Sequence, residues 1–392
     1  MPGRGAIVVA LATHACITTS IGARMPAIRD QTGLDAPQLG LALGAYALAL
    51  LLGTRLAGPL VDRFGSRDMV RVGIPVLCLT LIPIGLVSDL VTLAACLVLL
   101  GLMSGGLDVA MNAYAVELEQ RLGRPILSGI HAAWSAGMLA AAALAWLAVV
   151  AGLPPLAHFT ALGITLALLS PLALSRLEDM RPTATAQDSA TRIDRRALLA
   201  PVLTLGAIGF ASFVAEGSII DWGTIYLQDV GGIAPNVAVL AYLANSLGML
   251  TSRLVGDRLV TITGPVALVR WAGVALGLAL ACVIARPEPI VGFVAYAVMG
   301  FAIGPIFPTA LSAAGNRGVG QTMVVGWVVS LAYLGSVAGP VAIGLTAGSV
   351  GLRWAFLVPM ALAFGLALLA PFVRGAASGQ RALTSVAELP PR

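Results

Sequence analysis

Twelve apolar stretches follow one another along this chain, and its arginines gather in every second gap between them. A helix needs about 20 apolar residues to cross the hydrocarbon core of a bilayer, and the chain offers such runs almost from end to end. Charged residues make up only 10% of the 392 residues, whereas roughly a quarter of a water-soluble domain is charged. The runs are too long for transmembrane strands and lack their period-two alternation. We therefore expect an all-α integral membrane protein.

The apolar stretches predict twelve transmembrane helices, divided six and six by a polar segment that begins at residue 175. We place the helices at residues 5–28, 37–59, 69–87, 92–119, 127–150, 156–174, 199–227, 235–256, 264–283, 289–314, 321–345 and 351–373. The expected organisation is an N-terminal six-helix bundle at 1–174, a cytoplasmic linker at 175–198, a C-terminal six-helix bundle at 199–373 and a cytoplasmic tail at 374–392.

The distribution of basic residues predicts the orientation. All 23 of them are arginines, and most lie in the gaps after the even-numbered helices, whereas the opposite gaps hold few. Because cytoplasmic loops carry an excess of basic residues, both termini are expected in the cytoplasm, in a multi-pass protein of a bacterial inner membrane. The net charge of +5 is explained by this topology and gives no reason to expect nucleic acid as a partner.

The two halves of the chain repeat one short pattern. Residues 58–67 read Gly-Pro-Leu-Val-Asp-Arg-Phe-Gly-Ser-Arg, and residues 253–259 read Arg-Leu-Val-Gly-Asp-Arg-Leu. Each segment follows the second helix of its half, and we expect each Asp-Arg pair at the same cytoplasmic turn. Two related six-helix halves, each built from a three-helix repeat, are typical of secondary transporters.

Segment 58–67 resembles the signature that follows the second helix in the major facilitator superfamily, where Gly, Asp-Arg, Gly and a basic residue occur at these spacings. The twelve-helix layout extends the resemblance over almost the whole chain. It implies the major facilitator fold of two pseudo-symmetric six-helix bundles, alternating access, and a cavity lined by helices one, four, seven and ten. It also implies a monomer in the lipid bilayer.

A narrower resemblance lies in residues 107–114, Leu-Asp-Val-Ala-Met-Asn-Ala-Tyr, which look like the helix-four stretch of the fucose-permease-like branch. In that branch the acid on helix four takes part in proton coupling. Residues 216–222 and 123–125 resemble a bacterial subgroup near it. Fucose permease also uses an acid in helix one, where this chain has Thr13 and His14 instead.

Asp108 is the foremost candidate for proton coupling, and Glu216 and His14 are further ones. Asp108 is expected about 24 Å into helix four, where an isolated acid costs about 2.5–3.5 kcal/mol and must face a cavity or a partner. A carboxylate in a low-dielectric pocket can bind and release a proton. The alternatives are structural: an acid that ties two helices together, a solvated acid near the membrane surface, or a packing histidine.

Polar and aromatic residues near these acids are candidates for substrate binding. Asn112 lies one turn after Asp108, so both side chains project from one face of helix four. The aromatic candidates could instead pack between helices or belong to an interfacial belt. The complete set is Asn112, Asp221, Trp222, Tyr242 and Asn245.

Charged residues near the cytoplasmic ends of helices two and eight are candidates for gating. Arg55 could extend to the membrane surface or pair with Asp62, two turns further along the same face. We expect Asp62 and its neighbouring arginines to form a latch that holds the outward-facing state and breaks on opening inward. Pro305 and Pro308 break the backbone pairing of helix ten, which predicts a kink or gate there. The complete set is Arg55, Asp62, Arg63, Arg67, Asp257, Arg258, Pro305 and Pro308.

These features predict a secondary active transporter that moves a small polar solute together with protons by symport. Proton-driven export of drugs or metabolites remains an alternative, because the same fold serves both directions. A transport-inactive sensor and a passive facilitator are less favoured, since the chain keeps Asp108 and Glu216. No Gly-rich nucleotide loop, Cys/His cluster or hydrolase spacing occurs, so we expect neither an enzyme nor a cofactor.

Overall fold

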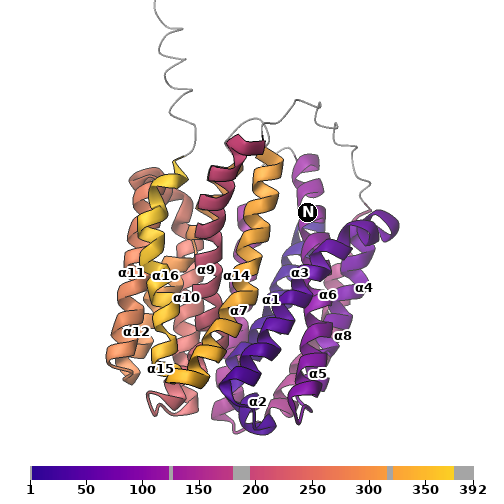
Figure 1. The fold of residues 1–392 in the computed structure, drawn as a ribbon. Coiled ribbons are helices and arrows are strands. Elements are labelled where there is room, and N and C mark those ends of the chain that lie inside the picture. The colour runs from indigo at the N-terminus through magenta and orange to yellow at the C-terminus, as the bar shows by residue number, and fades with distance from the viewer. Residues whose placement is uncertain (1, 123–126, 180–194, 316–320, 375–392) are drawn as a thin grey trace, which may run out of the picture.

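The computed structural model describes residues 2–122, 127–179, 195–315 and 321–374, and every regular element in these ranges is a helix. The helices stand side by side in two halves, indigo to magenta and red to yellow in Figure 1. The first residues of the chain and its last described residues lie at the same end of the bundle, which we call the terminal face. The opposite end is called the distal face.

Each half contains six membrane-crossing units. The N-terminal half consists of α1 (Pro2–Ala23), α2 (Met25–Thr32), α3 (Ala36–Phe64), α4 (Ser66–Leu79), α5 (Leu81–Ile84), α6 (Leu90–Leu122), α7 (Leu127–Val150) and α8 (Pro155–Leu174). The C-terminal half consists of α9 (Arg195–Asp229), α10 (Pro235–Thr263), α11 (Pro265–Ala285), α12 (Pro289–Ile303), α13 (Ile306–Gly315), α14 (Gln321–Val350), α15 (Leu352–Ala355), α16 (Leu357–Leu369) and the 3-10 turn η1 (Ala370–Val373).

Within the described ranges, 11 spans are long and apolar enough to cross a membrane, against twelve expected. The missing one is the stretch predicted at 69–87. It forms two helices, α4 and α5, because the chain is interrupted at Thr80, and neither piece reaches the length of a span. The difference is therefore one of helix continuity, and the stretch still crosses the bundle beside α8 (Figure 1).

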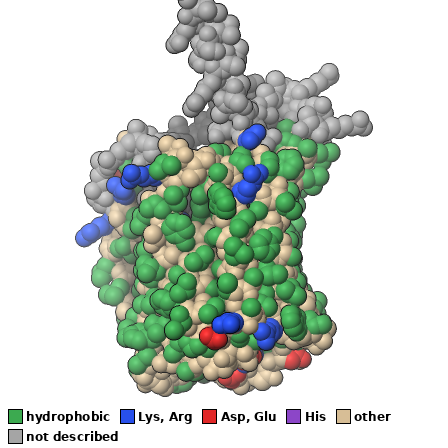
Figure 2. Space-filling model, turned by 90° about the vertical axis from the view of Figure 1, so that its left-hand side faces the viewer, with side chains coloured by type: hydrophobic (Ala, Val, Ile, Leu, Met, Phe, Trp, Pro, Cys, Tyr) green, Lys and Arg blue, Asp and Glu red, His purple; other side chains and the backbone are tan. Residues whose placement is uncertain are grey.

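The outer surface matches a hydrocarbon environment. Figure 2 shows hydrophobic side chains over the middle of the molecule and charged side chains near its two ends. Leu168, Ile290 and Leu368 expose 70%, 80% and 79% of their surface. A water-soluble monomer rarely exposes a continuous apolar surface of this extent, so the exposure indicates contact with lipid.

Two glycines mark equivalent turns in the two halves. Gly65 ends α3 and precedes α4, and Gly264 ends α10 and precedes α11, with φ of 80° and 76°. Glycine adopts positive φ without the steric cost that other residues bear. Both α3 and α10 contain 29 residues.

Aligning the two helices by their lengths corrects one expectation from the sequence. Asp62 lies three residues before Gly65, whereas Asp257 lies seven before Gly264. The two Asp-Arg pairs therefore do not occupy the same turn. The second lies about one helical turn deeper, because a helix rises by one turn in 3.6 residues.

The two halves meet closely at the distal face, where α3 packs against α14. A Cβ atom built on Gly344 would lie 2.6 Å from the carbonyl oxygen of Ala36 and 2.9 Å from Cα of Gly40. The two backbones can approach this closely only because both positions are glycine, as is common where membrane helices pack. Pro37 and Gly348 extend the same contact toward the distal end.

A second distal contact is an ion pair between the halves. Arg29 on α2 donates through Nη1 and Nη2 to the carboxylate of Asp229, the last residue of α9. The hydrogen bond from Nη2 to Oδ1 is 2.9 Å long. This hydrogen bonding raises the pKa of the Arg29 guanidinium above its ordinary value. Both side chains remain partly exposed, so we expect the glycine packing to contribute more to closure than the pair does.

Replacing Gly344 with valine should prevent the distal face from closing as observed, because its Cβ would overlap the backbone of α3. Closure is measured by disulfide formation between Pro37→Cys and Gly348→Cys, in a chain from which the four native cysteines have been removed. The cross-link should form readily in the parent and slowly in Gly344→Val.

The matched control is Gly326→Val, which lies on the same helix but has no atom within 4 Å of its built Cβ. It should cross-link like the parent. Equal cross-linking of Gly344→Val and the parent would show that the distal contact does not depend on this close approach.

Candidate functional site

Asp108 lies in the interior of the bundle and is bound from both halves. It is 18 residues from the start of α6, a rise of about 27 Å. Its Oδ1 accepts a hydrogen bond from Nδ2 of Asn112 at 3.2 Å, and Asn112 also donates to the Asp108 carbonyl at 2.8 Å. Its Oδ2 accepts from the hydroxyl of Tyr333 on α14 at 3.3 Å. The carboxylate thus has only neutral donors, and one of them crosses between the halves.

Tyr333 contacts Asp108 but was not among the candidate site residues of the sequence. Its ring packs against Phe213, with centroids 5.6 Å apart, and Phe213 packs edge-on against Phe307 at 4.9 Å. In the sequence Tyr333 is simply one aromatic residue in an apolar run. Only its hydroxyl, in a span that is otherwise apolar, could have indicated a buried partner.

Two more acids, Glu216 and Asp221, lie inside the bundle on α9. They are 13 and 8 residues from its distal end, about 20 Å and 12 Å along the helix. Glu216 is close enough to Arg253 on α10 for their opposite charges to interact, and Asp221 interacts with Glu216. Both acids are surrounded by the protein and yet keep part of their side-chain surface accessible. They therefore border space within the bundle.

One tyrosine hydroxyl binds an acid of this group, and a second tyrosine interacts electrostatically with two of the acids. Tyr46 on α3 is near both Asp108 and Asp221. Tyr333 is near Asp108, Glu216 and Tyr46. The acids thus form one electrostatically linked group, with Asp221 nearest the distal face and Asp108 nearest the terminal face.

Two arginines bridge the halves by equivalent contacts. Nη2 of Arg55 donates to Oγ of Ser330 at 2.8 Å, linking α3 to α14. Nη1 of Arg253 donates to Oγ of Ser135, also at 2.8 Å, linking α10 to α7. The arginines are residues 20 and 19 of their helices, so the contacts are related by the symmetry of the halves. The pairing of Arg55 with Asp62 that the sequence allowed is not formed.

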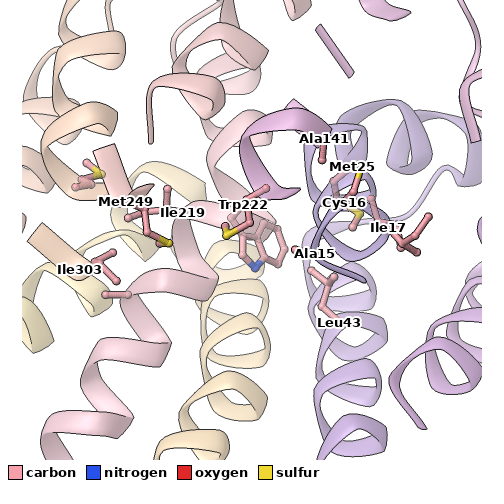
Figure 3. Close-up of a cluster of buried hydrophobic side chains, with 14 of the residues drawn as sticks. Ala15, Cys16, Ile17, Met25, Leu43, Ala141, Ile219, Trp222, Met249 and Ile303 are labelled. Atoms are coloured by element: carbon pink, nitrogen blue, oxygen red, sulfur yellow. The ribbon is translucent and has the colours of Figure 1, made fainter. Parts of the chain in front are cut away.

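The aromatic and amide candidates of the second half are fully buried. Trp222 and Tyr242 have no exposed surface, and Asn245 exposes 1%. Figure 3 shows Trp222 in the buried cluster beside Ala15 of α1, where α1 and α9 meet. The indole nitrogen of Trp222, the hydroxyl of Tyr242 and Oδ1 of Asn245 have no hydrogen-bond partner in the described part of the chain. Buried polar atoms are rarely left unpaired, so each such atom calls for an explanation.

His14 is buried, but the structure does not bring it to Asp108. Its ring contacts Trp134 edge-on, with centroids 5.0 Å apart. Neither ring nitrogen has a hydrogen-bond partner. Among the described residues, His14 therefore makes no hydrogen bond to Asp108.

The residues expected to form the latch are not joined to one another. Asp62 and Arg63 are exposed, and Asp62 forms no hydrogen bond or ion pair with any described residue. The Arg63 guanidinium lies over the ring of Phe64, 5.2 Å from its centroid. In the second half Arg258 is exposed, and the side chain of Asp257 lies outside the described part.

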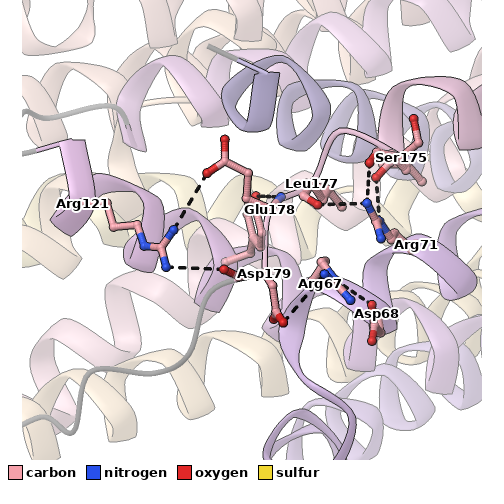
Figure 4. A network of polar contacts seen from close by, with 10 residues as sticks. Arg67, Asp68, Arg71, Arg121, Ser175, Leu177, Glu178 and Asp179 are labelled. Atoms are coloured by element: carbon pink, nitrogen blue, oxygen red, sulfur yellow. Dashed lines mark hydrogen bonds and ion pairs between the residues drawn. The ribbon is translucent and has the colours of Figure 1, made fainter.

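The third latch residue, Arg67, belongs to a polar network at the terminal face (Figure 4). It donates to Asp68 at 2.7 Å and lies 3.8 Å from Asp179, which follows α8. Arg71 donates to the carbonyl oxygens at the end of α8, which have no partner within that helix. These acceptors belong to Leu174, Ser175 and Leu177.

The tenth span is interrupted at Gly304 and Pro305, between α12 and α13. Pro305 is buried, and its carbonyl accepts hydrogen bonds from the backbone nitrogen and hydroxyl of Thr309 at 3.2 Å and 2.7 Å. Pro308 is exposed within α13.

Among the described residues, no group of His, Cys, Asp and Glu side chains could hold a metal ion.

Known proteins resemble this chain over most of its length. The profile of the Major Facilitator Superfamily matches residues 7–318. The uncharacterized transporter y4wD of Sinorhizobium fredii is 31% identical over 360 residues, which cover 90% of this chain and 93% of that protein.

Solved structures share the fold at low sequence identity. A variant of the nucleoside transporter NupG superposes with a TM-score of 0.76 at 13% identity, covering 95% of this chain and 99% of that one. A D-xylose-proton symporter gives a TM-score of 0.74 at 14% identity, covering 95% and 96%. The family match and the helical architecture together establish that this chain is a membrane transporter of the Major Facilitator Superfamily.

Proposed function

We propose that this protein is a secondary active transporter that moves a small polar solute across the bacterial inner membrane, coupled to protons, by alternating access. The observation that carries the proposal is the position of Asp108. It is an interior carboxylate whose hydrogen-bond donors, among the described residues, are all neutral, and one donor, Tyr333, belongs to the other half. Uptake or loss of a proton at Asp108 therefore changes a contact between the halves.

The physical argument is one of differential stability. A charged carboxylate in the bundle depends on its donors, whereas a protonated one loses much less when a donor departs. Protonation of Asp108 thus lowers the cost of separating Tyr333 from α6. A ligand or proton shifts a conformational equilibrium only if it binds the two states with different affinities. The hydrogen bond between Tyr333 and Asp108 would make the proton affinity of Asp108 differ between the state that has the bond and the state that lacks it.

The observed state fits an inward-facing transporter. The distal face is closed by α3 against α14 and by Arg29 with Asp229. At the terminal face Asp62 has no partner, as expected of a latch that has released. The arginine distribution of the sequence assigns the terminal face, with both termini, to the cytoplasm. Arg55, Arg253 and the interrupted tenth span are the further elements we assign to gating.

We assign solute binding to Asn112, Asp221, Trp222, Tyr242 and Asn245. Glu216 and His14 are further groups that we expect to exchange protons. The names of the two structural neighbours, a nucleoside transporter and a xylose-proton symporter, support a small polar solute and, for the second, a proton. Proton-driven export remains the second candidate. It is favoured by the presence of two acids beyond Asp108 in the same interior.

Asp108→Asn should abolish accumulation of solute driven by a proton gradient while sparing exchange of solute across the membrane. Asparagine keeps the hydrogen-bonding shape of a protonated acid but cannot gain or lose a proton. The solute is first identified by a melting screen on purified protein across sugars, nucleosides, amino acids, organic acids and amines. Accumulation and counterflow are then measured in proteoliposomes.

Asp108→Glu is the matched control, since it keeps the titrating group and should retain accumulation at a reduced rate. Undiminished accumulation by Asp108→Asn would refute proton coupling at this residue. Loss of both accumulation and exchange in a variant that melts like the parent would instead assign Asp108 to solute binding.

Asp62→Asn should slow turnover with little change in solute affinity, because the residue lies at the terminal end of α3 and far from the three acids. The measurement compares the maximal rate and the half-saturating solute concentration of the variant and the parent. Arg63→Gln, at the neighbouring exposed position, shows whether the charge of the turn or Asp62 itself matters. A large loss of affinity in Asp62→Asn would place the latch assignment in error.

A further inference from the structure

The interior carries more negative than positive charge. Of its three acids, Glu216 is near enough to Arg253 for the arginine to offset part of its charge, although the two form no ion pair among the described residues. Asp108 has neutral donors, and Asp221 forms no hydrogen bond or ion pair with any described residue. An uncompensated carboxylate inside a membrane protein is costly, so such a residue indicates a functional site with a partner of opposite charge.

Asp221 is next to unoccupied space. A Cβ atom built on Gly217, one turn earlier on α9, would meet only Oδ2 of Asp221, at 3.6 Å, within a radius of 4 Å. The carboxylate therefore borders a volume that no other described side chain fills. Its partly accessible surface agrees with this.

Two buried side chains of α10 carry polar atoms without a hydrogen-bond partner among the described residues. Tyr242 is fully buried, its hydroxyl has no hydrogen-bond partner, and it interacts with both Asp221 and Glu216. Asn245, three residues on, lies on the same face of α10, and its carbonyl oxygen is also unpaired. A carboxylate, a phenol oxygen and an amide oxygen are all hydrogen-bond acceptors, and an ammonium or guanidinium supplies only donors.

We propose that Asp221, with Tyr242 and Asn245, forms the subsite for a positively charged group of the solute, an organic ammonium or guanidinium. This rests on the proposed transport function and names its substrate class. Tyr46 of the other half interacts electrostatically with Asp221, and aromatic rings attract organic cations. The subsite is at the closed, distal end of the interior. A solute entering from the terminal face therefore passes Asp108 before reaching Asp221.

A protonated Asp221 with no cationic solute is the competing explanation, and the two differ in what asparagine does. Asp221→Asn imitates a protonated acid. If the residue serves only to hold a proton, the variant should still bind solute. If the residue binds a cation, the variant should lose about tenfold or more in affinity, since a hydrogen bond to a charged group contributes about 1.5–3 kcal/mol.

The experiment measures binding to the purified full-length protein with matched probes. The cations are tetramethylammonium, choline, 2-phenylethylammonium and agmatine. Each is paired with an uncharged analogue of the same shape, such as 3,3-dimethylbutan-1-ol for choline. Sodium chloride is a separate arm that distinguishes an organic cation from a metal ion. At least one organic cation should bind, its uncharged analogue should not, and Asp221→Asn should abolish the difference.

Gly217→Val is a second variant that tests the space rather than the charge. Its side chain should fill the volume beside Asp221 and block binding of the cation, while the control Gly326→Val should bind like the parent. Glu216→Gln is a charge control that removes an acid already compensated by Arg253, and it should weaken binding less than Asp221→Asn does.

Three outcomes would overturn the proposal. They are failure of every organic cation to bind a protein that melts cooperatively, binding of sodium alone, and unchanged cation affinity in Asp221→Asn. The transport function is tested apart from this. A neutral solute that a proton gradient accumulates would refute the cation subsite and leave the transporter intact. A cation that binds without accumulation would leave the subsite and refute proton-driven transport.

Discussion

The hydrogen bond between Tyr333 and Asp108 joins the chemistry of the interior to the arrangement of the halves. A carboxylate within a bilayer is expensive unless donors or a counter-charge surround it, and here one of its two donors belongs to the opposite half. The strength of that bond depends on the charge of the acid, because bonds to an ionised group are about twice as strong as neutral ones. The protonation state of one residue therefore bears on the contact between two bundles, which is the physical requirement for coupling.

Closure of the distal face depends mainly on backbone packing rather than on a charged contact. The backbones of α3 and α14 touch at Gly40 and Gly344, and this packing buries no charge. The ion pair of Arg29 with Asp229 is partly exposed and contributes little by itself. A contact made of dispersion and one weak pair can form and break without a large barrier from desolvation. Closure with this balance is compatible with the alternating access that we propose, in which this interface opens and closes.

The sequence was sufficient for most of the architecture and for less of the site. The predicted helix at 127–150 matches α7 at both ends, because length and hydropathy alone define a membrane span. The break at Thr80 was not foreseen, since no charged residue lies close to Thr80 in that apolar run. Asp108 and Asn112 share a face as their spacing requires. Tyr333, by contrast, is 225 residues from Asp108, and a contact so remote depends on how the halves dock rather than on any local pattern.

The repeated Asp-Arg pair also shows where prediction from the sequence was incomplete. The letters Asp-Arg recur in both halves, but the helix lengths place Asp257 about one turn deeper than Asp62 relative to the glycine that ends each helix. The arginines that bridge the halves, Arg55 and Arg253, nevertheless occupy nearly equal positions and bind a serine each. Arg253 also interacts electrostatically with Glu216, whereas no acid of the described residues is paired with Arg55. The architecture is thus closely symmetric while its charges are not: the acids Glu216 and Asp221 both lie on α9 of the second half, and Asp108 lies on α6 of the first.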